Sequence, residues 1–253
     1  MSRFNYEYFR VRANLGVYKK RLFKSSEIIK KALSMDKSWY VSCSGGKDSV
    51  ALAHLVSRLS PNIEIFSQKD DCDFPGEKEY LEDLASKFNW NLRIVEPDFS
   101  LFARIREFSD NICEDIHSRG KQLSDEAFYS LIRKQEERYD GVFLGLRAEE
   151  SNAREKNFLK RGYIYKRKNG KMVCIPLAAW KGDDVFTYLV SNDIPIFDIY
   201  LKTSLHSDPT KIRKAWFLPG ACARQGQVVW LQHYYPDIYF ELKEVCPEVS
   251  NYV

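Results

Sequence analysis

Residues 42–49 join a run of strand formers to an apolar run that predicts a helix. The two glycines, Gly45 and Gly46, allow a tight turn and let backbone N–H groups approach a ligand. The N-terminus of the following helix adds unpaired N–H groups and a partial positive charge, so the turn favours a phosphate. Lys47 adds a full positive charge. The residues of this phosphate loop are Ser42, Cys43, Ser44, Gly45, Gly46, Lys47, Asp48 and Ser49.

The phosphate loop differs from two common phosphate-binding motifs. A Walker A loop needs Gly, four residues and then Gly-Lys-Ser/Thr. Here Val41 stands where the first Gly should be, and Asp48 follows Lys47. The dinucleotide pattern Gly-x-Gly-x-x-Gly is also absent from this turn. The simpler alternative is a Gly-Ser turn that caps the helix and binds no ligand.

Two further polar segments follow predicted strands. The strand predicted at 63–66 leads into the loop 68–76, which carries acids including Asp71. The apolar strand predicted at 142–146 leads into Arg147 and, further on, Arg154. If residues 147–154 are helical, these two arginines share a face with Glu150. Two arginines at the end of a buried strand would form a clamp for an oxyanion, and the alternative is an exposed helix with Glu–Arg pairs.

Strand-like and helix-like segments alternate along the chain, which predicts an α/β fold with a doubly wound, mostly parallel, five-stranded sheet. In such a sheet ligands gather at the carboxyl ends of the strands, where the phosphate loop lies. We expect helical extensions at both ends of the chain, with Ser25-Ser26-Glu27 opening the N-terminal helix. The expected domains are a helical extension at 1–36, a nucleotide-binding domain at 37–205 and a helical tail at 206–253.

Residues 160–171 contain six basic residues and no acid. Asn169-Gly170 is a hairpin turn signal, so residues 163–166 and 171–175 are expected to pair. A basic hairpin of this kind suits contact with nucleic acid or with a triphosphate. A solvated hairpin without a ligand is the equally weighted alternative.

Composition sets broad limits on function. The chain has 253 residues, 44% of them hydrophobic, and a net charge of +4, which by itself implies no nucleic-acid partner. The six cysteines are scattered without a Cys-x-x-Cys pair, which favours a reducing compartment and argues against a zinc ribbon. The N-terminal residues show no leader-like apolar run and nothing approaches a membrane span, so we expect a cytoplasmic protein without membrane contact.

The hexapeptide Ser44 to Ser49 resembles the pyrophosphate loop (PP-loop) of the adenine-nucleotide alpha hydrolase superfamily. Gly145-Leu146-Arg147 through Arg154 is similar to the arginine segment of the phosphoadenosine phosphosulfate reductase family within it. Residues 176–180, Pro-Leu-Ala-Ala-Trp, with Asp184-Val185 beyond, resemble another segment of that family. The resemblance covers roughly residues 38 to 200 and implies its Rossmann-like PP-loop (HUP) fold with a bound adenine nucleotide.

The resemblance implies roles for several residues. ATP, or phosphoadenosine phosphosulfate, would bind the phosphate loop and Gly145, with Mg²⁺ held by Asp48 or Asp71. Lys47, Arg147 and Arg154 would act in catalysis. The family's Glu-Cys-Gly-x-His segment is missing from this sequence. We therefore favour ATP, cleaved between its alpha and beta phosphates to adenylylate an anionic or sulfur-transfer acceptor.

The tail leaves other functions open. Cys222 lies near Arg224, whose charge would lower the pKa of its thiol, although an inert small residue is the simpler interpretation. Cys222 or Cys246 would supply the thiol of a sulfonucleotide reductase, the second function class. The third is a nucleotide-binding subunit of a DNA-modification or defence system without catalysis. The acceptor, a homodimer or partner subunit, and the pathway stay open. Basic or polar tail positions expected to contact the nucleotide are Lys211, Arg213, Cys222 and Arg224.

Overall fold

The computed structural model describes residues 4–71, 73–98, 100, 129–202, 210, 212, 227–245 and 247–253. The chain divides into two compact units. The first comprises Met1–Ser67, Gly76–Ile94 and Lys134–Ile212, and the second comprises Gln68–Pro75, Val95–Arg133 and Arg213–Val253. The phosphate loop and the arginine segment both belong to the first unit. The expected domain limits at 36 and 205 stay a prediction.

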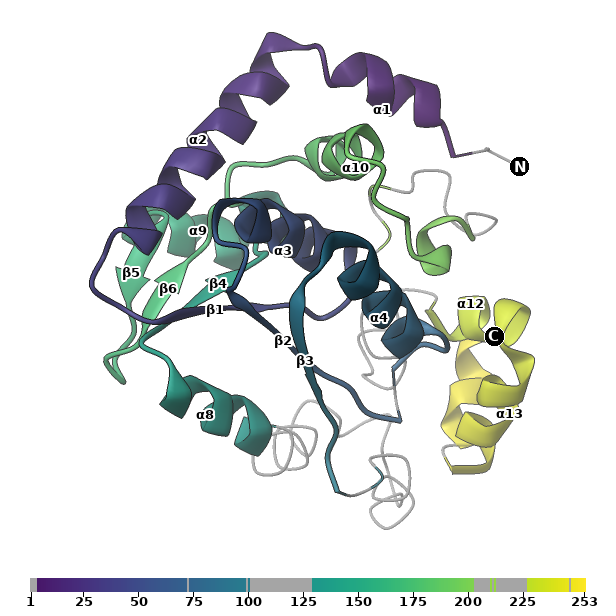
Figure 1. Ribbon diagram of the computed structural model, residues 1–253. Helices are drawn as coiled ribbons and strands as arrows, with labels where there is room; N and C mark the ends of the chain where they lie inside the picture. The colour runs from purple at the N-terminus through teal and green to yellow at the C-terminus, as the bar shows by residue number, and fades with distance from the viewer. Residues whose placement is uncertain are drawn as a thin grey trace. The chain divides into compact units, whose positions relative to one another are not determined.

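A mostly parallel sheet forms the centre of the α/β fold, as the sequence predicts (Figure 1). Its strand order is β3-β2-β1-β4-β6-β5. β1 pairs in parallel with β2 and β4, β4 pairs in parallel with β6, and β5 runs antiparallel to β6. The strands are β1 (Trp39–Ser42), β2 (Glu64–Gln68), β3 (Asn91–Val95), β4 (Gly141–Leu144), β5 (Ile164–Lys166) and β6 (Met172–Cys174).

The predicted count of five strands was wrong, since the described residues form six. Both strands of the basic hairpin join the sheet: β6 pairs with β4, and β5 becomes the edge strand. The pairing of β1 with its two neighbours explains why all three strands are apolar in sequence. Val41 of β1 lies beside Ile65 of β2 on one side and Phe143 of β4 on the other. All three side chains are fully buried.

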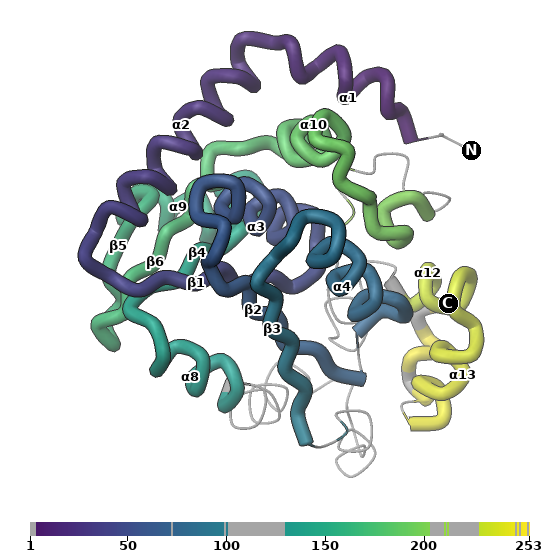
Figure 2. Tube along the Cα trace, viewed as in Figure 1, coloured from purple at the N-terminus to yellow at the C-terminus, as the bar shows by residue number. Residues whose placement is uncertain are grey.

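Helices cover the sheet on both sides. In Figure 1, α3 and α10 lie above the sheet and α8 lies below it. Figure 2 shows α1 beside α10, and α2 running from there toward the hairpin strands β5 and β6. The longer helices are α1 (Tyr6–Arg12), α2 (Gly16–Leu33), α3 (Lys47–Leu59), α4 (Glu77–Phe88), α8 (Tyr129–Arg138), α9 (Asn152–Arg161), α10 (Gly182–Ser191), α12 (Gln227–Tyr234) and α13 (Pro236–Val245). The short 3-10 helices are η2 (Ala148–Glu150), η3 (Asp198–Tyr200) and η5 (Pro247–Tyr252).

The prediction that Ser25 opens the N-terminal helix was wrong, because α2 already begins at Gly16. Ser25 is buried in the middle of the helix, where its Oγ donates to the Pro176 carbonyl oxygen over 2.7 Å. Ser25 Oγ in turn accepts a hydrogen bond from Trp180 Nε1 over 2.8 Å. Ser25 therefore does not cap a helix but joins α2 to residues 176–180. In the part of the chain that is described, no helix is both long and apolar enough to cross a bilayer.

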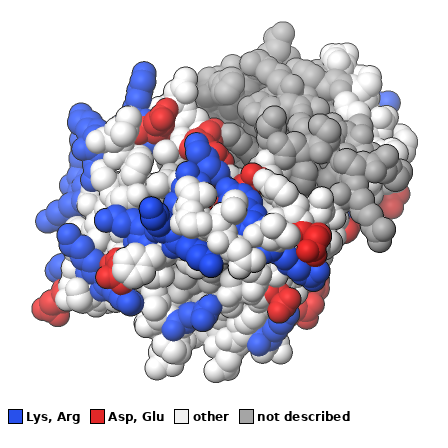
Figure 3. All heavy atoms as spheres, turned by 90° about the horizontal axis from the view of Figure 1, so that it is seen from above, with Lys and Arg blue, Asp and Glu red and all other residues white. Residues whose placement is uncertain are grey.

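The surface charge is uneven. Figure 3 shows more Lys and Arg than Asp and Glu over the left half of the face seen from above, on the side where Figure 1 places α2.

Candidate functional site

The phosphate loop turns from β1 into α3 through two glycines with different conformations. Gly45 has a φ of +80°, and a Cβ there would lie 2.9 Å from a carboxylate oxygen of Glu77. The positive φ favours glycine here. Gly46 is extended, with φ −71° and ψ 152°, and caps α3 without a side-chain acceptor. The loop therefore brings backbone N–H groups to the N-terminus of α3, as an anion site needs.

The hydroxyls of the loop hold its shape. Ser49 Oγ donates to the Gly46 carbonyl oxygen over 2.9 Å and lies 3.2 Å from the Ser44 amide nitrogen, which donates to it. The two hydroxyl oxygens, of Ser44 and Ser49, are also 3.2 Å apart. Ser42 is the last residue of β1, paired in register with Phe66 and Leu144. The serines predicted to bind phosphate thus meet at one turn, and Ser42 supports it from the strand.

Lys47 is almost completely buried, with 3% of its surface exposed. Its Nζ donates to the Ile212 carbonyl oxygen over 2.9 Å and lies 3.4 Å from Asp48 Oδ2. It also lies 5.1 Å from the ring centre of Tyr200. Burial lowers the pKa of Lys47, and Asp48 opposes this effect. Its cation is therefore held in place by three different groups.

The backbone N–H of Lys47 already has a partner, because it donates to Tyr200 Oη over 3.0 Å. Tyr200 ends η3, and its side chain is fully buried. Burial raises the pKa of the Tyr200 hydroxyl, so it stays protonated. A neutral hydroxyl thus occupies one of the N–H groups that a phosphate would use. No pattern in the sequence points to Tyr200.

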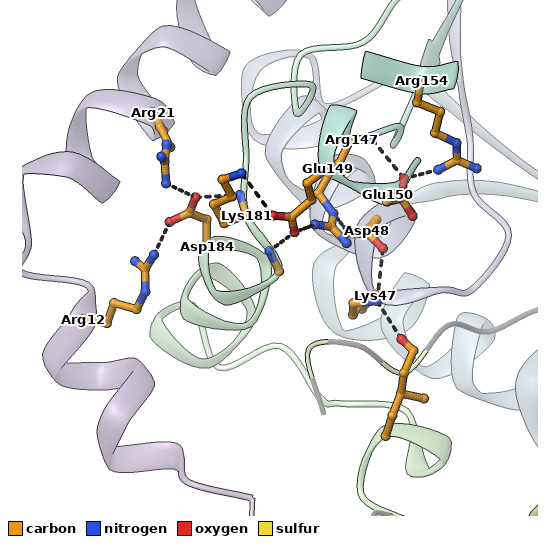
Figure 4. A network of polar contacts seen from close by, with 12 residues as sticks. Arg12, Arg21, Lys47, Asp48, Arg147, Glu149, Glu150, Arg154, Lys181 and Asp184 are labelled. Carbon is orange, nitrogen blue, oxygen red and sulfur yellow. Dashed lines mark hydrogen bonds and ion pairs between the residues drawn. The ribbon is translucent and has the colours of Figure 1, made fainter. Parts of the chain in front are cut away.

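Gly145 lets the end of β4 approach the first turn of α3. A Cβ at Gly145 would lie 2.9 Å from the backbone of Asp48 and Ser49. Two residues later Arg147 is buried, and its Nε donates to Asp48 Oδ1 over 2.5 Å (Figure 4). The sequence predicted both Gly145 and Arg147 at the phosphate loop, and the structure places them beside it.

Three carboxylates, those of Asp48, Glu149 and Glu150, balance the charge of Arg147. Its guanidinium also pairs with Glu149, and its backbone N–H donates to Glu150 over 3.0 Å. Burial alone would lower the pKa of Arg147, but the carboxylates of Asp48, Glu150 and Glu149 outweigh that effect and raise it. Since a guanidinium has five N–H donors, Arg147 retains donors for an oxyanion.

Ion pairs and hydrogen bonds, including one from the Lys181 amide to Asp184 over 2.8 Å, link this site to the N-terminal helices (Figure 4). Glu149 accepts a hydrogen bond from the Gly182 amide over 2.6 Å and pairs with Lys181 at 3.4 Å. Asp184, two residues into α10, is fully buried and pairs with Arg12 at 2.9 Å and Arg21 at 2.7 Å. Glu149 was not among the predicted site residues, although a carboxylate two residues after Arg147 could have indicated a partner for that guanidinium.

Arg154 does not share a helical face with Arg147, so that prediction was wrong. η2 ends at Glu150, and the Ser151 hydroxyl caps a new helix, α9, by accepting from the Arg154 amide over 3.2 Å. The Arg154 side chain is 43% exposed and pairs with Glu150 (Figure 4). Glu150 therefore joins the two arginines, but only Arg147 reaches the phosphate loop.

The two predicted metal ligands, Asp48 and Asp71, belong to different compact units. Both Asp48 oxygens face cations, Arg147 and Lys47, so this carboxylate offers Mg²⁺ no uncompensated oxygen. Asp71 belongs to the second unit, where it accepts a hydrogen bond from Ser100. The described residues contain no group of three or more metal-ligating side chains. The Mg²⁺ role stays a prediction.

All four predicted tail contacts, Lys211, Arg213, Cys222 and Arg224, lie outside the described residues, as does Cys246. Cys43 and Cys174 are described, and both are buried. Burial raises the pKa of the Cys174 thiol, so that side chain stays protonated. Neither buried thiol has the exposure of a reactive cysteine.

A family model for the phosphoadenosine phosphosulfate reductase domain matches residues 38–226. The chain belongs to this family. The match begins at the strand before the phosphate loop and includes Arg147. The resemblance to the family and the PP-loop fold, stated from the sequence, are confirmed.

The curated relatives are distant. An adenosine 5′-phosphosulfate reductase from Oceanobacillus iheyensis is 27% identical over 164 residues, which cover 62% of this chain and 64% of the relative. A phosphoadenosine 5′-phosphosulfate reductase from Vibrio parahaemolyticus is 25% identical over 197 residues, covering 76% of this chain and 73% of the relative. The chain thus spans a little under two thirds of the first of these relatives.

A solved structure shares the fold. The phosphoadenylyl-sulfate reductase from Candida auris, in a phosphate complex, superposes with a TM-score of 0.55 at 16% identity. The likeness covers 69% of this chain and 82% of the other.

Proposed function

We propose that this chain is a sulfonucleotide reductase, which releases sulfite from an adenosine phosphosulfate with electrons from a dithiol. The observation that carries the proposal is the family match over residues 38–226, which contains the phosphate loop, Arg147 and Cys222. The curated relatives named as reductases of adenosine 5′-phosphosulfate or its 3′-phosphorylated form support it. This is the alternative, rather than the favoured function, of the sequence analysis.

The described residues suit an anionic end of a nucleotide. The loop amides and the buried cation of Lys47 form a site of low exposure, where charges attract more strongly than in water. Arg147 keeps spare donors beside that site and is held by Asp48. These groups would hold the phosphosulfate still, and positioning is a large part of catalysis for a bound anion.

The reaction also needs a thiolate. In the proposed step, a cysteine thiolate attacks the sulfur of the sulfate group. The bond between the sulfate sulfur and the bridging phosphate oxygen breaks, so the nucleotide leaves and the sulfonate stays on the cysteine. A dithiol then releases sulfite and ends as a disulfide. Since Cys43 and Cys174 are buried, Cys222 is our first candidate, because Arg224 lies two residues away and positive charge lowers a thiol pKa.

One assay tests this function. Sulfite release would be measured with each of the two adenosine phosphosulfates and with dithiothreitol as the dithiol. We expect release by the wild-type chain, and loss of release in Cys222→Ser with nucleotide binding kept. Cys246→Ser is the matched control. Loss in Cys246→Ser alone would move the role to Cys246, and no sulfite from either nucleotide would contradict the proposal.

A second candidate, cleavage of ATP between its alpha and beta phosphates, is favoured by the complete Ser-Gly-Gly-Lys-Asp-Ser loop. The absence of a Glu-Cys-Gly-x-His segment from this sequence points the same way. Here pyrophosphate would leave as an acceptor is adenylylated. Pyrophosphate release with ATP, abolished by Lys47→Ala, would support this candidate. Nucleotide binding with neither product would favour a non-catalytic subunit.

A further inference from the structure

Basic residues concentrate on two segments of the first unit, α2 and residues 152–171. Together these segments carry fourteen Lys and Arg but only two acids, Glu27 and Glu155, although the whole chain has a net charge of only +4. We call the exposed cations of these two segments the basic face. The face lies on the side where Figure 3 shows blue side chains gathered.

On α2 the charge points outward along one stripe. Lys20, Lys24 and Lys31 follow helical spacing and are all exposed. Within the described part of the chain, no carboxylate pairs with any of these three. The opposite, apolar side of α2 is buried through residues such as Ile29 and Ala32. At 1.5 Å per residue, Lys20 and Lys24 are about 6 Å apart along the axis, which suits successive charges of one strand.

A pocket of about 180 Å³ opens between α2 and the basic hairpin. Its rim is cationic, with Lys20, Arg21 and Lys24 on the α2 side, and Tyr163 stands on the hairpin side. Its remaining lining is mainly apolar: Val17, Ser25, Pro176, Ala179 and Trp180. The volume is below the roughly 300–1,000 Å³ of pockets for drug-sized ligands, so it suits one flat ring rather than a whole nucleotide.

The hairpin extends the same surface. Lys166 and Lys168 are exposed on it, while Arg161 lies 5.1 Å from the ring centre of Tyr165. The hairpin itself is anchored, because Arg167 pairs with Glu136 and Lys171 Nζ donates to the Tyr139 carbonyl oxygen over 2.7 Å. Arg167 and Lys171 therefore anchor the hairpin to α8 and to the residue that follows it, whereas Lys166 and Lys168 face solvent.

We propose that the basic face binds single-stranded RNA, with one unstacked base in the pocket and neighbouring phosphates on Lys20 and Lys24. A row of cations beside a small, mainly apolar pocket matches the phosphates and bases of a single strand. RNA loops present such unpaired bases, whereas bases of duplex DNA are stacked away from a pocket.

Fluorescence anisotropy with a labelled 20-nucleotide RNA, measured between 50 and 200 mM salt, tests the proposal. We expect binding that weakens with salt, because cations release counterions from the phosphates. In the double variant Lys20→Gln/Lys24→Gln the slope of log affinity against log salt should fall by about 0.7 for each lysine. Tyr163→Leu, which changes no charge, should weaken binding several-fold and leave the slope unchanged.

The control is Lys37→Gln/Lys243→Gln, which removes the same charge from two exposed lysines elsewhere. We expect its binding to match wild type. An equal loss in this control would overturn the proposed face, as would binding of a duplex or of single-stranded DNA as tightly as RNA. Binding to phosphatidylserine vesicles without binding to RNA would also overturn it. The assay contains no adenine nucleotide, so its result is independent of the proposed function.

Discussion

Arg147 at the end of β4 donates from Nε to Asp48 Oδ1 in the first turn of α3, across 2.5 Å. Both side chains are mostly shielded from water, with 4% and 16% exposed. The pair fixes a guanidinium beside the phosphate loop before any ligand arrives. It also joins the two strand ends, β1 and β4, at which an α/β sheet binds its ligands.

Replacing Arg147 with Ala should destabilise the protein by about 3 kcal/mol, because the mostly buried Asp48 would lose the closer of its two cationic partners and Glu149 would lose its pair with Arg147. Urea unfolding followed by circular dichroism measures this change. Arg154→Ala is the matched control, since its side chain is 43% exposed and a surface ion pair contributes at most about 1 kcal/mol. Equal losses in the two variants would contradict the structural role of the Arg147–Asp48 pair.

Replacing Gly145 with Ala should cost about 1–3 kcal/mol, because a Cβ there would meet the backbone of α3 at 2.9 Å. The helix start must shift, so affinity for inorganic pyrophosphate should fall as well. Gly46→Ala is the comparison: its Cβ would lie 3.5 Å from its nearest neighbours, Ser44 Oγ and Tyr200 Oη, at a φ of −71°. We expect that variant to unfold like wild type, and an unchanged Gly145→Ala protein would disprove the close approach.

Local patterns explain what the sequence could predict. α4 follows a local pattern, because Tyr80, Leu81 and Leu84 repeat at helical spacing between a glycine and an asparagine. The phosphate loop was predictable for the same reason, since its strand, glycines and helix are consecutive in sequence. Gly145 and Arg147 followed because a buried strand ends just before them.

Contacts between distant residues explain what the sequence could not predict. The Lys47 amide meets a hydroxyl 153 residues away, on Tyr200, and the Lys47 ammonium meets the Ile212 carbonyl 165 residues away. No spacing rule connects such positions. The prediction for residues 147–154 was wrong for a different reason. Helical spacing predicted one face for Arg147 and Arg154, but Ser151 caps a new helix between them. A serine cap within a charged run is a weak signal.

Stability should fall in mild acid because of His54. This side chain is buried, and its Nδ1 lies 2.8 Å from Tyr188 Oη. Burial, with help from Arg58 and Lys87, lowers the pKa of His54 from 6.5 to about 4. Between these values the unfolded chain binds a proton that the folded one does not, so stability is lost as pH falls from 6.5 toward 4. The loss attributable to His54 is about 3 kcal/mol.

His54→Gln tests this assignment, because Gln cannot titrate. Urea unfolding of both proteins at several pH values from 7 to 4.5 gives the difference in unfolding free energy between them. We expect the advantage of wild type over the variant to shrink as the pH falls. A constant difference across this range would mean that His54 does not carry the acid sensitivity.

Replacing Tyr200 with Phe should strengthen the binding of inorganic pyrophosphate. In the free protein the Lys47 amide donates to Tyr200 Oη, and a phosphate oxygen that takes this N–H must displace the hydroxyl. Without the hydroxyl nothing is displaced, so binding gains about 1 kcal/mol, or roughly fivefold in affinity. Isothermal titration calorimetry measures the change, and the free variant should be less stable by about 1–2 kcal/mol because its amide lacks a partner.

Tyr188→Phe is the matched control for that experiment. Tyr188 is also buried and hydrogen-bonded, but to His54 on α3 rather than to the phosphate loop. We expect a similar loss of stability and no gain in pyrophosphate affinity, because no loop amide is released. Weaker binding in Tyr200→Phe would instead mean that the hydroxyl contacts the ligand directly, and an equal gain in both variants would assign the effect to general loosening of the fold.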